Sequence, residues 1–162
     1  MTSREFFVET LKDELPRFER VFRALPESRL DYKPHEKSRS ASELLGVFAD
    51  EAQMFPAIIE KGVVDMTGFT PASYTKVADA VAAFGRGFDG ALRAAGSSDE
   101  EQWKSTARLV MGDKVVWETT RGAMAWGLIL DLVHHRGQLS VYLRPMGAQV
   151  PAIYGPSGDA AE

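Results

Sequence analysis

Hydrophobic residues recur at steps of three and four positions along much of the chain, which is the spacing of amphipathic helices. The pattern predicts helices over residues 3–25, 41–61, about 75–95 and about 121–143. Pro16 interrupts the first stretch without changing its rhythm, so we expect a kink there. Ser40 and Glu43 have the spacing of a capping box and mark the start of the second helix. Ser73 or Thr75 is the expected cap of the third.

Between the third and last predicted helices the pattern changes to short β-rich runs. These runs flank Gly112 and Asp113, a pair typical of two-residue hairpin turns, although an extended excursion with one bend fits the same residues. Thr119 or Thr120 is the expected cap of the last helix. The proline- and glycine-rich sequence after Leu143 predicts an irregular tail.

Four amphipathic helices favour a four-helix bundle, because a bundle buries all four apolar faces at once. We therefore predict an all-α fold with a short β-like excursion before the last helix, in a single domain over residues 1–162. The composition agrees with this interpretation, since 44% hydrophobic and 26% charged residues are ordinary for a globular domain.

Charge and cysteine content exclude several classes of function. A net charge of -4 argues against a nucleic-acid-binding protein, which is usually basic. The sequence contains no cysteine, so disulfides, thiolate metal ligands and a nucleophilic cysteine are excluded. Residues 1–15 include acidic residues and lack a long apolar run, so we expect no signal peptide, no membrane partner and a cytoplasmic location.

The last predicted helix carries polar side chains on the stripe that should face inward. That stripe reads Met124, Leu128, Asp131, His135, Gln138 and Tyr142. Asp131 and His135 lie one turn apart and can share a divalent metal ion such as zinc, nickel or manganese. The alternative is a hydrogen bond between His135 and either Asp131 or Gln138, which satisfies the same polar groups.

Glu51 has a comparable position in the second predicted helix, where its neighbours on the stripe are apolar. It is a candidate third metal ligand or a general base, and in a bundle it would meet Asp131 and His135 between the second and fourth helices. In the alternative interpretation, Glu51 lies at the margin of the stripe and reaches solvent. His35 is isolated in a polar connection, so we expect it to be a loop residue, and His134 points about 100° away from His135.

Three segments of the sequence carry a resemblance to a known family. They read HHRGQLSVYLRPMG and VPAIYG near the C-terminal end and LDYKPHEKSRSASELL before the second helix. Together they resemble the DinB-like superfamily, also called the DinB/YfiT family. The resemblance implies an up-down-down-up bundle of four helices, often a homodimer, with a metal held by three histidines. One histidine comes from the second helix, and two that are four residues apart come from the last.

Carried over residue by residue, the later histidine of that pair is His135, and Asp131 stands at the position of the earlier one. Val47 stands at the position of the second-helix histidine. This chain therefore keeps one of the three family ligands, replaces another by an oxygen donor and lacks the third. Glu51 or a water molecule would have to fill the vacant position.

The better-understood members of the family are similar to metal-dependent transferases or isomerases that use a low-molecular-weight thiol such as bacillithiol or mycothiol. The resemblance implies a metal-dependent hydrolase or thiol S-transferase, with a divalent metal on His135, Asp131 and Glu51 and a thiol as cosubstrate. The alternative is a non-catalytic bundle that has lost the metal and binds a small molecule or a protein in the same cleft.

Overall fold

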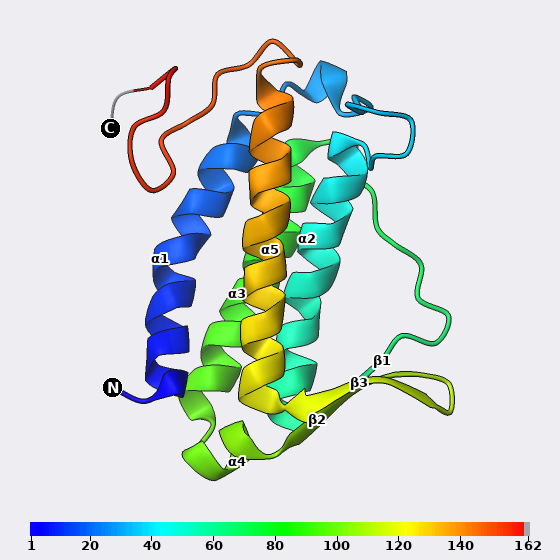
Figure 1. Cartoon of the computed structure of the whole chain (residues 1–162), viewed down its shortest axis with the longest axis vertical. Helices are drawn as coiled ribbons and strands as arrows, with labels where there is room; N and C mark the ends of the chain where they lie inside the picture. Colours follow the sequence, from blue (N-terminus) through cyan, green and yellow to red (C-terminus); the bar gives the residue numbers. More distant parts are fainter. Residues whose placement is uncertain (161–162) are drawn as a thin grey trace.

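The computed structural model of the protein describes residues 1–160 and consists mainly of helices that lie side by side (Figure 1). The long helices are α1 (Ser3–Arg23), α2 (Ala41–Pro56), α3 (Val77–Ser97) and α5 (Arg121–Leu143). The shorter helical elements are the 3-10 turn η1 (Glu27–Arg29), the π-helical turn η2 (Ala57–Lys61) and α4 (Glu100–Lys104). Residues 161–162 of the predicted single domain lie outside the described residues. None of the helices in residues 1–160 is long and apolar enough to cross a membrane.

Aromatic side chains join the long helices in the core. The ring of Phe22 on α1 lies edge to face against Phe48 of α2, with centroids 4.7 Å apart, and against Phe84 of α3, with centroids 5.1 Å apart. All three rings are fully buried. Edge-to-face pairs contribute about 0.5–1.5 kcal/mol beyond the area that they bury, so Phe22 ties α1 to both α2 and α3.

Most of the predicted helix ends are confirmed by their hydrogen bonds. The Ser40 hydroxyl accepts from the Glu43 amide at 3.1 Å, and the Glu43 carboxylate accepts from the Ser40 amide at 2.6 Å, which completes the capping box of α2. Gly62 ends the π-helical turn with φ 72°, a left-handed conformation that glycine adopts without strain. The Thr120 hydroxyl caps α5 by accepting from the Ala123 amide at 3.2 Å.

The predicted cap of the third helix is wrong. Neither Ser73 nor Thr75 caps it, because α3 begins at Val77. The Val77 amide instead donates to the Glu27 carboxylate at 3.0 Å, and Glu27 comes from η1, before α2. A cap supplied from so far along the chain leaves no local sequence signal.

A small sheet lies at the end of the molecule near the start of α5 (Figure 1). Its strands are β1 (Val63–Asp65), β2 (Thr106–Met111) and β3 (Lys114–Thr120). The chain between β2 and β3 turns at Gly112 and Asp113, so the hairpin prediction is confirmed. The parallel pairing of β1 with β2 and the short helix α4 were not expected. The fold is therefore mostly helical, as predicted, with a three-stranded sheet that the all-α description omits.

The connection between α2 and α3, residues 66–76, lies along the side of α2. Asp50 of α2 accepts a hydrogen bond from the Ala72 amide at 2.9 Å, and the Ser42 hydroxyl donates to the Tyr74 carbonyl at 2.7 Å. At the closest approach α2 carries Gly46, where a Cβ would lie 1.8 Å from the Ala72 oxygen. The absence of a side chain at Gly46 therefore allows this connection to pack against the helix.

Candidate functional site

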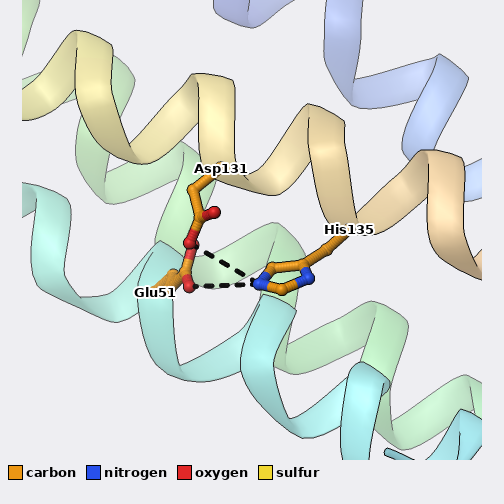
Figure 2. Close-up of side chains that lie close together, drawn as sticks. All are labelled: Glu51, Asp131 and His135. Carbon is orange, nitrogen blue, oxygen red and sulfur yellow. Dashed lines mark ion pairs between the residues drawn. The ribbon is translucent and has the colours of Figure 1, made fainter. Parts of the chain in front are cut away.

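Three potential metal ligands from two helices point toward one another (Figure 2). Nε2 of His135 lies 3.5 Å from Oδ2 of Asp131, one turn earlier on α5. The same nitrogen lies 3.9 Å from Oε1 of Glu51 on α2. Ligand atoms from all three residues lie within 4.8 Å of one another. The structure thus brings together the residues that the sequence singled out.

The three side chains differ in burial. The side chains of His135 and Glu51 are 9% and 14% exposed, so Glu51 does not reach freely into solvent as the alternative interpretation expected. The Asp131 side chain is 52% exposed, and Gln138 is also exposed. The predicted inward stripe of α5 is therefore wrong at these two positions, because the buried face is centred on Ile129, Leu132 and Leu139 instead.

The environment of Glu51 disfavours a bare carboxylate. Burial and the negative charge of the neighbouring Asp131 raise the pKa of Glu51 to about 8. In the absence of a cation, Glu51 therefore holds a proton at neutral pH. Its Oε2 atom is also buried and has no hydrogen-bond partner among the described residues. A cation between Glu51 and Asp131 would favour the charged form of Glu51 and give the buried oxygen a partner.

The imidazole of His135 is oriented by Gln138. Nδ1 of His135 lies 2.8 Å from Oε1 of Gln138, and Nε2 of Gln138 lies 3.0 Å from Nε2 of His134. Because an amide oxygen only accepts hydrogen bonds, Nδ1 of His135 is the donor, and Nε2 is the ring nitrogen that faces the two carboxylates. A histidine that binds a metal commonly donates its other ring N–H to such an acceptor. His134 contacts Gln138 and stays outside the ligand group.

Val47 and Glu51 both line a cavity of about 480 Å³ between α2 and the 66–76 connection. Val47 precedes Glu51 by one turn and offers no donor atom to a metal. Arg39 also lines this cavity, as do side chains of the connection. No signal in the sequence indicated that Arg39 lines a cavity. The cavity exists only because the 66–76 connection folds back over α2, and that depends on contacts between distant residues.

A second buried polar cluster joins α1, α5 and the C-terminal tail. The Arg136 side chain is 2% exposed and forms an ion pair with Glu14 of α1. The Tyr154 hydroxyl donates to the Glu14 carboxylate at 3.0 Å and accepts from Arg136. The Arg136 guanidinium also lies over the Phe18 ring, 4.5 Å from its centroid. Every charge is paired in this cluster, so we interpret it as the attachment of the irregular tail to the helices.

The DinB family model matches the chain over residues 1–162. A DinB-like protein from Bacillus subtilis has a similar structure, with a TM-score of 0.67 and 20% identity over 88% of this chain and 92% of that one. One from Bacillus cereus also has a TM-score of 0.67, with 18% identity over 93% of this chain and 97% of that one.

The mycothiol-dependent maleylpyruvate isomerase is a more distant structural neighbour. It has a TM-score of 0.54 and 10% identity, and the match covers 91% of this chain but 62% of the isomerase. No curated protein matches the sequence significantly. The structural neighbours share the fold, and the family model spans the whole sequence, so the chain belongs to the DinB family.

Proposed function

We propose that this protein is a metal-dependent enzyme that binds one divalent cation through Glu51, Asp131 and His135 and catalyses a thiol-transfer or hydrolytic reaction. The observation that supports it is the convergence of three ligand atoms within 4.8 Å, one of them on a carboxylate with a buried, unpartnered oxygen. We also propose, from the family resemblance, that the long helices form the up-down-down-up bundle and that the chain acts as a cytoplasmic homodimer.

The donor set fits a first-row divalent metal. Two carboxylates balance the charge of the cation, and one neutral imidazole adds a nitrogen donor. Imidazole suits zinc and nickel, whereas carboxylates suit manganese, so a carboxylate at position 131 in place of the family histidine moves the preference toward manganese. Three protein ligands leave a coordination position for a small molecule, as in catalytic zinc sites.

A bound divalent metal lowers the pKa of a coordinated water or thiol and so supplies a nucleophile at neutral pH. The chain's own residues prepare the site. Gln138 holds the His135 ring with Nε2 toward the carboxylates, and burial removes one carboxylate oxygen of Glu51 from solvent. Asp131 lies at the solvent side, where its carboxylate can accept a proton from an incoming group.

The absence of cysteine means that a thiol must come from a cosubstrate. A mycothiol-dependent isomerase is among the distant structural neighbours, which makes low-molecular-weight thiols the first class to test.

The second candidate function is a non-catalytic binding protein. The observation that favours it is Val47, which stands where the family resemblance places a metal-binding histidine and has no donor atom. In this case Glu51 stays protonated, and the cavity beside it binds a small molecule without metal.

The test is the metal content of tag-free protein after equilibration with zinc, nickel and manganese and removal of excess ions. We expect about one metal ion per chain in the wild type and almost none in His135→Ala. His35→Ala is the matched control, because His35 lies exposed in the connection before α2, and it should keep the metal. A wild-type protein that retains no metal under any of these conditions overturns the proposed enzyme and leaves the binding protein.

A further inference from the structure

The cavity beside Glu51 has the size of a small-molecule site. Its volume is about 480 Å³, within the range of roughly 300–1,000 Å³ that is usual for ligand pockets. One wall is the face of α2 that carries Val47, Glu51 and Met54, and the other is residues 66–73 of the connection. Arg39 lies on the lining just before α2 begins, and Glu51 lies about three turns further along that helix.

The carboxylates that line the cavity are already engaged. Glu43 accepts from the Ser40 amide and forms an ion pair with Lys33 at 3.2 Å. Asp50 accepts from the Ala72 amide, and Glu51 belongs to the metal-ligand group.

Arg39 differs from these residues. It is exposed, and its guanidinium has neither a hydrogen bond nor an ion pair within residues 1–160. Arg39 is therefore the charged side chain of the lining whose hydrogen-bond donors remain available to a ligand.

The charges and the apolar lining together define a class of ligand. Arginine pairs best with planar anions such as carboxylates, through two parallel hydrogen bonds. Glu43 and Asp50 on the same lining repel a doubly charged phosphate more strongly than a singly charged carboxylate, because the repulsion grows with the charge of the ligand. The apolar part of the lining includes Val47, Met54 and Phe69.

We propose that the cavity binds a small amphipathic carboxylic acid. Its carboxylate pairs with Arg39, its apolar chain packs along Val47, Met54 and Phe69, and its other end carries a donor for the metal beside Glu51. The position of the metal-binding end of the ligand rests on the proposed metal site, whereas the position of its carboxylate at Arg39 does not.

Two matched chelators test both ends at once. Adipic acid monohydroxamate and hexanohydroxamate have the same chain length and the same metal-binding group, but only the first carries a carboxylate. Calorimetric titration of the zinc- or manganese-loaded protein should show about tenfold tighter binding of the first. Arg39→Gln should abolish this preference and leave the affinity for hexanohydroxamate unchanged. Arg93→Gln, an exposed change on α3 outside the cavity, should keep the preference.

Equal affinity for the two hydroxamates, or a preference that survives Arg39→Gln, overturns the inference while the metal site stands. If neither hydroxamate binds the loaded protein, the metal is not open to a ligand in the cavity, and hexanoate is titrated into metal-free protein to test the carboxylate site alone. Saturable shifts of the Met54 and Met66 methyl signals that disappear in Arg39→Gln then support the carboxylate site on its own. Their absence overturns it.

Discussion

Gln138 and His135, which are three residues apart on α5, form the contact that orients the imidazole: Oε1 of Gln138 lies 2.8 Å from Nδ1 of His135. This contact leaves Nε2 as the ring nitrogen that faces Glu51 and Asp131. Partners of this kind tune a metal site without touching the metal.

Removing this contact should weaken metal binding. In Gln138→Leu the imidazole loses its acceptor and can rotate or change tautomer, so we expect the affinity for zinc to fall about 10–100-fold. Competition with a chromophoric chelator measures the change. Gln149→Leu, an exposed change in the tail, should bind as the wild type does. Unchanged affinity in Gln138→Leu would show that packing alone orients the ring.

The stability of the metal-free protein should fall as the pH rises from about 5 to about 8. Burial and Asp131 raise the pKa of Glu51 from 4.5 to about 8, so the folded protein holds a proton that the unfolded chain releases in this interval. The unfolded state binds fewer protons, and the free energy of unfolding decreases with pH.

Glu51→Gln removes the titrating group and isolates its contribution. Urea unfolding in the presence of a chelator at pH 5.5 and pH 8.5 should show that the wild type loses about 1–3 kcal/mol more than the variant does. Equal losses in the two proteins would mean that Glu51 titrates near its ordinary value in the folded state.

Restoring a histidine at position 47 should strengthen the site. Val47 lies one turn before Glu51 and lines the same cavity, so the Val47→His side chain can add an imidazole donor from α2. We expect at least about tenfold tighter zinc binding than in the wild type, measured by chelator competition. Val141→His, an exposed change on α5, is the control and should give no gain. No gain at position 47 would place its side chain outside the coordination sphere.

Gly46→Ala should be strongly destabilising. The new Cβ would lie 1.8 Å from the Ala72 oxygen, so the connection must move away from α2. We expect a loss of about 2 kcal/mol or more in urea unfolding. Gly85→Ala on α3 is the matched control, because a Cβ there meets nothing within 4 Å, and it should gain up to about 1 kcal/mol from helix propensity. Similar effects of the two changes would argue against close contact at Gly46.

The sequence predicts what depends on local spacing. Helical periodicity located the long helices, and the starts of α2 and α5 followed from Ser40 and Thr120, whose hydrogen-bond partners lie within one turn. The pairing of Asp131 with His135 follows from the pitch of a helix, and bringing Glu51 to them required only that α2 and α5 be neighbours.

The features that were missed depend on contacts between distant segments. β1 is three residues long and forms only because β2 lies beside it, and α3 is capped by Glu27 from another part of the chain. The exposure of Asp131 could not be predicted, because the apolar residues of α5 fit two neighbouring stripes, one through Leu128 and one through Ile129. The structure buries the stripe through Ile129, which turns Asp131 toward solvent. Arg39 gains its position in a cavity from the connection that folds over α2.

That connection is attached to the rest of the fold at separate points. Near β1, the Met66 amide donates to the Val110 carbonyl at 2.8 Å, and the Gly112 amide donates to the Thr67 hydroxyl at 2.6 Å. Further on, Ala72 is held by Asp50. Residues 68–71, which include Phe69, lie between these attachments and belong to no helix or strand. Amino-acid substitutions within this segment can therefore change the shape of the cavity wall while the long helices and the three potential metal ligands keep their positions. Selectivity for the proposed carboxylic acid can then change independently of the proposed chemistry at His135.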